Sequence, residues 1–66
     1  MKKYNKGEWV FVRYWKDKIR CGQITGRSNF EGSHEVEIEE NGMKAYMNLA
    51  DDDVSRYARD FGKENI

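Results

Sequence analysis

Hydrophobic and polar positions alternate most regularly over residues 35–40, where valine and isoleucine separate glutamates. A period of two is typical of a β-strand with one buried and one wet face. Asn41–Gly42 follows directly and can supply the two positive φ angles of a type I′ hairpin turn. We therefore expect residues 43–49 to return as the partner strand. Three of its side chains should share one face: Ala45, Met47 and Leu49.

Two further strands are expected before this hairpin. Residues 8–15 are rich in β-branched and aromatic side chains, which favour a strand. A polar turn at residues 16–18 leads to a second strand over residues 19–25. Gly22 inside that strand indicates a bend or a close approach of another backbone. Residues 26–34 contain glycine, serine and asparagine and predict a loop.

The period changes after residue 50. Four residues recur at the i, i+3, i+4 and i+7 spacing of one helical stripe: Val54, Tyr57, Ala58 and Phe61. This pattern predicts a short amphipathic helix over about residues 52–61, with Asp51 as its N-cap. Such a short helix needs a surface to pack on. Trp9 and Phe11, expected on the outer face of the first strand, would either be covered by this helix or remain open as a binding surface.

Several short stretches carry a resemblance to a known family: residues 7–12 (GEWVFV), 22–24 (GQI), 36–38 (VEI), 41–42 (NG) and 48–51 (NLAD). Over residues 6–53 the chain resembles SH3-like small barrels, and most closely their Tudor and KOW branches. The resemblance implies a mainly β fold, an SH3-like small barrel of four to five bent strands with a short C-terminal α-helix. One domain would span residues 1–66, with the barrel over about 6–50. Its interior would be filled by Val10, Val12, Ile24, Val36, Ile38 and Leu49.

Tudor domains that read methylated side chains carry an aromatic cage. The resemblance places the four cage positions at Tyr14, Arg20, Asn41 and Met43. Only Tyr14 is aromatic, so recognition of methyl-lysine is not expected. The resemblance therefore predicts a fold more than a ligand.

Composition excludes several classes of protein. The chain has 66 residues, with one cysteine and one histidine, so an internal disulfide and a self-contained Cys/His zinc site are excluded. The longest apolar run is residues 9–12, far too short to span a membrane. His34 and Cys21 have no pattern of catalytic partners around them. We expect a cytoplasmic protein that is not an enzyme and holds no metal or cofactor.

Charge is distributed unevenly along the chain. The formal net charge is zero, but residues 1–33 carry a net +5 and residues 34–66 a net −5. The two halves could form surfaces of opposite sign, or could neutralise each other within the fold. One continuous basic face would favour a nucleic-acid partner, and interleaved charges would favour a protein partner.

The first functional hypothesis is recognition of a protein partner through an aromatic and arginine surface, because Trp, Tyr and Arg dominate interface hot spots. The candidate residues are Tyr14, Trp15, Arg13, Arg20, Trp9 and Phe30. A domain of this size would suit an adaptor, or an inhibitor encoded by a phage or mobile element that occludes a larger protein.

The alternative hypothesis is nucleic-acid binding through the basic half of the chain. Basic side chains would follow the phosphates while rings stack on bases. The candidate residues are Lys16, Lys18, Arg20 and Arg27, with Trp15 or Phe30 for stacking. The sequence leaves the oligomeric state open.

Overall fold

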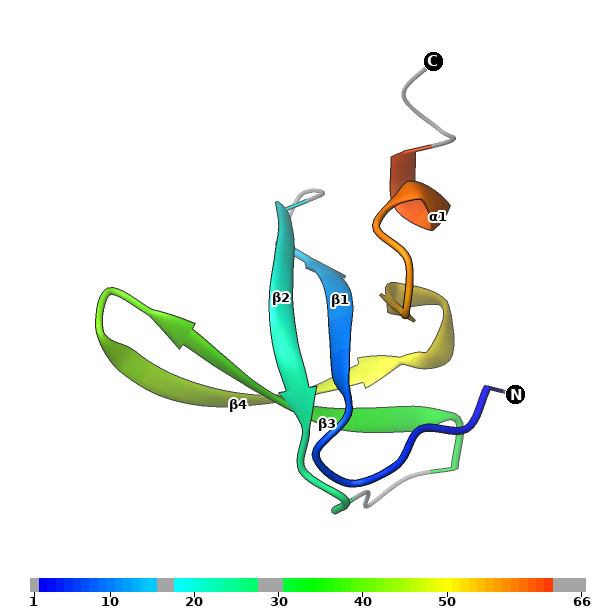
Figure 1. Cartoon of the computed structure of the whole chain (residues 1–66), viewed down its shortest axis with the longest axis horizontal. Helices are drawn as coiled ribbons and strands as arrows, with labels where there is room; N and C mark the ends of the chain where they lie inside the picture. The colour runs from blue at the N-terminus through cyan, green and yellow to red at the C-terminus, as the bar shows by residue number, and fades with distance from the viewer. Residues whose placement is uncertain (1, 16–17, 28–30, 63–66) are drawn as a thin grey trace.

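The computed structural model describes residues 2–15, 18–27 and 31–62, and these fold into one strongly curled antiparallel sheet (Figure 1). The sheet order is β4-β3-β2-β1-β5, so four strands form a meander and the last strand returns beside the first. The expectation of a mainly β fold with a short helix is confirmed. The elements are β1 (Trp9–Tyr14), β2 (Lys18–Ile24), β3 (Ser33–Glu40), β4 (Met43–Ala50), a 3-10 turn η1 (Asp51–Asp53), β5 (Val54–Ser55) and α1 (Arg59–Gly62).

The core lies on the inner side of the curl and follows the alternation of the sequence. Five of the six expected interior residues are buried, and Leu49 packs half-buried at the edge of the cluster. The five are Val10, Val12, Ile24, Val36 and Ile38. Asn41 and Gly42 have φ angles of 56° and 78°, as a type I′ turn requires, and they pin the register of β3 against β4.

Gly22 marks the tightest point of the sheet. It lies opposite Val10 on β1, on the inner side of β2. A Cβ added there would collide with Cγ1 of Val36 and lie 3.0 Å from the carbonyl oxygen of Glu37. The expected close approach is confirmed, and it lets β3 fold over β2.

The prediction of a helix over residues 52–61 is wrong for most of that range. Val54 is fully buried in β5, directly opposite Val12, and only residues 59–62 are helical. Pairing with β1 satisfies the backbone of this segment and buries Val54 in the same step, which a lone helical turn cannot do. Tertiary pairing therefore overrides the helical period.

Of the three residues expected to cover the outer face of β1 (Tyr57, Ala58 and Phe61), Phe61 is the buried one. Its side chain is buried, and the guanidinium of Arg13 on the outer face of β1 lies 5.3 Å from its ring centroid. Tyr57 and the neighbouring alanine are exposed, and Trp9 remains 63% exposed. The helix thus covers one end of the outer face of β1 and leaves the other end open.

The N-terminal segment closes the open side of the curled sheet. Tyr4 packs against the core, donates its hydroxyl to the carbonyl oxygen of Val54 at 3.1 Å, and meets the ring of His34 edge-on at 4.9 Å. Burial and the nearby carboxylate of Asp51 raise the pKa of Tyr4. The segment thereby joins β3 to β5, which are not neighbours in the sheet.

Asp51 takes a different role from the expected helix cap. Its Oδ1 lies 2.7 Å from Nε2 of His34 and also accepts the backbone N–H of Lys2 at 3.2 Å. The hydrogen bond with His34 holds the pKa of Asp51 below its ordinary value. The carboxylate ties η1 to β3 and to the N-terminal segment.

Candidate protein-binding surface

A row of four residues crosses the outer face of the sheet, one from each of β1 to β4. Trp9 lies opposite Gln23, Gln23 opposite Glu37, and Glu37 opposite Tyr46. Their neighbours Val10, Ile24 and Val36 point into the core, so strand alternation directs the row outward. We call these four residues the transverse row.

The two ends of the transverse row are its exposed aromatic residues. Trp9 is 63% exposed and Tyr46 is 55% exposed, whereas the two residues between them are half-buried. Three strand spacings of about 4.8 Å separate the two aromatic positions by about 14 Å, measured along the curled sheet. Two aromatic anchors at this separation on a rigid sheet can bracket one extended segment of a partner.

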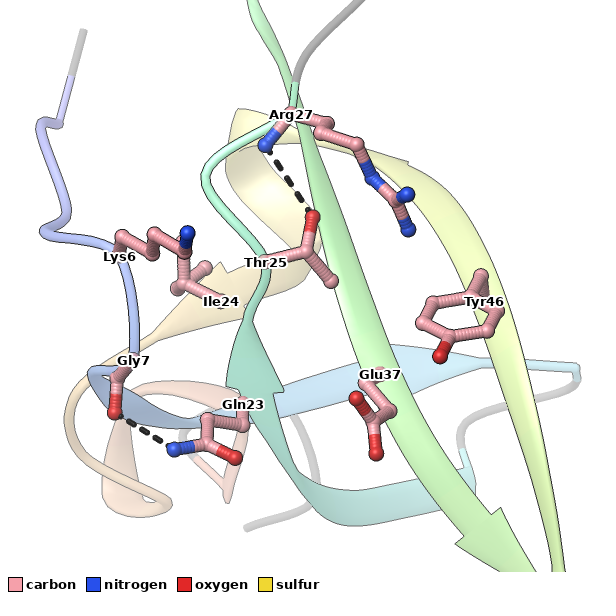
Figure 2. Close-up of a pocket in the computed structure, with 8 residues that line it drawn as sticks. All are labelled: Lys6, Gly7, Gln23, Ile24, Thr25, Arg27, Glu37 and Tyr46. Carbon is pink, nitrogen blue, oxygen red and sulfur yellow. Dashed lines mark hydrogen bonds between the residues drawn. The ribbon is translucent and has the colours of Figure 1, made fainter.

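A shallow pocket of about 400 Å³ lies beside the row (Figure 2). Its walls come from the N-terminal segment, the end of β2 with the turn that follows, and the middle of β3 and β4. The lining residues are Lys6, Gly7, Gln23, Ile24, Thr25, Arg27, Glu37 and Tyr46. Three members of the row therefore form part of the pocket.

Hydrogen bonds order the pocket before any partner arrives. Gln23 donates its amide to the carbonyl oxygen of Gly7 at 2.9 Å (Figure 2). The backbone N–H of Gly7 in turn donates to the carbonyl oxygen of Ile24 at 2.8 Å, and a φ of 87° there favours glycine. The N-terminal segment is thereby fixed against the end of β2.

Glu35 holds two residues of the opposite wall in place, Thr25 and Arg27. It accepts a hydrogen bond from the Thr25 hydroxyl at 2.7 Å and an ion pair from Arg27 at 2.8 Å, and both hold its pKa below the ordinary value. The Arg27 guanidinium then lies 5.3 Å from the centroid of the Tyr46 ring. This cation–π contact orients the ring that ends the transverse row.

Ion pairs interleave the charges of the fold. Glu37, in the middle of the transverse row, pairs with Lys44 at 3.3 Å. Four further pairs between an arginine or a lysine and a carboxylate are Arg13–Asp53, Lys18–Glu40, Arg27–Glu35 and Arg56–Glu8. All four connect residues 1–33 to residues 34–66. These ion pairs place a carboxylate beside each of the five basic side chains.

The aromatic and arginine residues expected to form one surface are separated. Trp9 and Arg13 lie on the outer face of β1, where Arg13 is bound to Asp53. Tyr14 lies on the inner side, opposite Lys18. Trp15, with a φ of 46° and 74% exposure, follows β1 and stands about 20 Å along the strand from Trp9. Phe30 lies outside the described residues.

A smaller cluster remains at the hairpin end of β1 and β2. Tyr14 donates its hydroxyl to Glu40 at 3.2 Å, and burial together with this carboxylate raises the pKa of Tyr14. Arg20 lies exposed on the same side of the sheet and donates a hydrogen bond to the carbonyl oxygen of Ile19 at 3.1 Å. Tyr14, Arg20 and the exposed Trp15 thus belong to one region, apart from the transverse row.

The residues expected to bind nucleic acid are also dispersed. Lys18 begins β2 and pairs with Glu40, whereas Arg27 follows the far end of β2 and pairs with Glu35. Arg20 points to the inner side and Arg27 borders the outer face. Lys16 lies outside the described residues.

Three further observations concern the cysteine, metal-ligating side chains and membrane-spanning helices. Cys21 does not fill the core and is exposed on the outer face, opposite Phe11. Within residues 2–15, 18–27 and 31–62, no three metal-ligating side chains come together. No helix in the same described ranges is long and apolar enough to cross a membrane.

Sequence reasoning did not identify Tyr46 or the pocket. The Asn41–Gly42 turn could have placed Tyr46 beside Glu37, because a two-residue turn fixes the pairing. No protein-family model, curated protein or solved structure matches this chain.

Proposed function

We propose that this chain is a non-catalytic binding module that recognises a protein partner through the outer face of its sheet. The observation that carries the proposal is the transverse row, with Trp9 and Tyr46 exposed at its ends beside an ordered pocket. Exposed aromatic side chains on rigid strands lose little conformational entropy on binding. Arg27, held over Tyr46, supplies the arginine of the surface.

The charge pattern supports a protein partner over a nucleic acid. Glu37 occupies the middle of the row, and Glu35 lies beside the pocket on the same face. A phosphate backbone laid across this face would meet those carboxylates, whereas nucleic-acid interfaces are strongly positive. A peptide segment can instead place polar groups opposite Gln23 and Glu37.

We further propose that the fold belongs to the SH3-like small barrels over residues 6–53, as the Tudor-like and KOW-like resemblance of the sequence implies. The sheet order, the strong curl and the return of β5 to β1 support this relationship. A cytoplasmic location is also part of the proposal. An exposed free thiol at Cys21 is more compatible with a reducing compartment than with an oxidising one.

The test compares the Trp9→Ala and Tyr46→Ala variants with Trp15→Ala as a matched control. All three rings are more than half exposed, so truncation should leave the fold intact. Proteins retained from nuclease-treated lysate by the wild-type chain should be lost with the first two variants and kept by Trp15→Ala. Loss with Trp15→Ala alone would move the site to the Tyr14–Trp15–Arg20 region.

A titration with oligonucleotides tests the other class of partner. Single-stranded and double-stranded DNA and RNA are added to labelled protein at two salt concentrations. We expect no salt-sensitive shift of the indole signals of Trp9 or Trp15. Salt-sensitive shifts around residues 18–20 and the Trp15 indole would contradict the proposal and favour stacking on bases.

A further inference from the structure

β4 presents a long free edge. Its eight residues pair along their full length with β3, and among the described strands β4 has no neighbour on its other side. The hairpin that it forms with β3 reaches out to one side of the molecule, away from β1 and β5 (Figure 1). Natural edge strands are usually short, or are protected by proline, bulges or charged side chains, especially lysine. β4 contains no proline, and its one charged residue is Lys44.

The turn determines which backbone groups face the free edge. Glu40 and Met43 close the two-residue turn, so the N–H of Met43 points to β3, and the direction then alternates along β4. At the far end, the N–H of Asp51 donates to the carbonyl oxygen of Gly32 at 2.9 Å, which agrees with this alternation. The backbone amides and carbonyls of Lys44, Tyr46 and Asn48 therefore face away from β3.

The side chains of β4 are self-complementary about Tyr46. In an antiparallel pair of two such strands centred there, Met43 faces Leu49 of the second copy and Ala45 faces Met47 of the second copy. Both pairs lie on the inner side, and the second joins a small to a large apolar side chain. On the outer side, Lys44 faces Asn48 of the second copy, and the two Tyr46 rings meet. No like charges lie opposite each other.

We propose that β4 pairs with β4 of a second copy of this chain, forming a two-fold dimer with one continuous sheet. The pairing satisfies the free backbone groups of three residues in each copy and covers Met43, which is 72% exposed. It also joins the two transverse rows end to end at the two-fold axis. A dimer of this kind closes on itself, because each free β4 edge is used once.

Sedimentation equilibrium over about 5–500 μM protein tests the association directly. We expect the mass to rise from that of the 7.9 kDa chain towards twice that value. Hydrogen exchange at the same concentrations gives the site. The amides of Lys44, Tyr46 and Asn48 should gain protection as the protein associates, whereas those of Met43, Ala45 and Met47 should be protected throughout. A monomer at every concentration would overturn the proposal.

A proline at position 48 tests the backbone pairing itself. The Asn48 N–H faces the free edge, so Asn48→Pro should leave the β3–β4 ladder intact while removing one donor at the interface. The variant should associate at least 10-fold more weakly than Asn48→Ala, which keeps the donor. Circular dichroism checks that both variants fold. Equal association of two folded variants would overturn the proposal.

A charged residue at position 48 should change the stability of the monomer and the affinity of the dimer in opposite directions. Asn48 lies opposite Glu35 within its own chain and opposite Lys44 of the second copy in the dimer. Asn48→Lys should therefore stabilise the monomer yet weaken the dimer about 3- to 10-fold, and Asn48→Glu should do the reverse. An interface elsewhere would not invert the two effects, and parallel changes would overturn the proposal.

Discussion

Arg56 and Glu8 stand 48 positions apart in the sequence and form a two-point ion pair in the fold. Nε of Arg56 donates to Oε2 of Glu8, and Nη2 donates to Oε1 at 3.2 Å. The same guanidinium reaches the carbonyl oxygen of Lys3 at 2.6 Å and lies 4.6 Å from the Tyr4 ring centroid. One side chain just after β5 thus contacts three residues of the N-terminal segment: Lys3, Tyr4 and Glu8.

The first prediction concerns this arginine. Arg56→Gln should lower Tm by up to about 5 °C at low salt, because the ion pair and the stacking on Tyr4 are lost together. Arg59→Gln is the control, since Arg59 is also exposed and lies 4.7 Å over a ring, that of Tyr57. It should change Tm little. The loss in Arg56→Gln should shrink at high salt, and equal losses in both variants would contradict a special role for Arg56.

The second prediction concerns acid. Hydrogen bonds hold the pKa of Asp51 below its ordinary value of 3.8, and those of Glu8 and Glu35 below 4.5. The unfolded chain therefore binds protons more readily at these groups than the folded chain does. The stabilisation that these three carboxylates contribute is complete when the pH lies above their ordinary pKa values. It is lost as the pH falls through their lowered pKa values. Urea unfolding at several pH values between 7 and 2 should show this decline.

The variant Asp51→Asn isolates one of these groups. The amide cannot titrate, so the decline below pH 4 should be shallower than in the wild-type chain. The variant should also be less stable at pH 7, because the charged partner of His34 is gone. Parallel curves for the two proteins would show that Asp51 contributes nothing to the acid response.

The third prediction concerns the tightest point of the sheet. Gly22→Ala should lower the free energy of unfolding by about 2–3 kcal/mol, because the new Cβ meets Val36 and the backbone of Glu37. Gly32→Ala is the comparison. Nothing lies within 4 Å of its added Cβ, and its φ of 82° alone should cost about 1 kcal/mol. Denaturant unfolding of both variants measures the difference, and the reverse order would contradict the packing argument.

The fourth prediction separates the observed C-terminal segment from the helix that its pattern suggests. Phe61→Ala should cost about 3 kcal/mol, because the ring is 5% exposed, whereas Tyr57→Ala should cost little, because that ring is 54% exposed. A docked helix over residues 52–61 would make the two losses similar. Far-ultraviolet circular dichroism should show no gain of helix in either variant.

The strands could be predicted because their local pattern and their tertiary role agree. Val36 and Ile38 alternate with glutamates, and the Asn41–Gly42 turn fixes their partner strand. Around Val54 the local sequence pattern and the tertiary role disagree. Its spacing to Phe61 fits a helix, but the partner that decides its conformation is Val12, far away in the sequence. Tyr4 gave no periodic signal at all, because its role depends on His34 and Val54.

The candidate surface was harder to predict for the same reason. Trp9 was recognised as a residue that could remain open, and its exposure depends on how little of the outer face α1 covers. Glu37 and Tyr46 follow from the hairpin turn. Gln23 joins them only through the register between β2 and β3, which the loop after β2 does not specify. To predict a surface that crosses four strands, the register of every pair of neighbouring strands must be known.

The contacts of Arg56 and Val54 also set an order of events during synthesis. The N-terminal segment and strand β1 leave the ribosome first. Their partners Val54, Ser55 and Arg56 emerge almost a whole domain later. Until then the inner side of the meander has no closing edge. Folding of this domain must therefore finish after its own translation, at a rate governed by closing the longest loop in the chain.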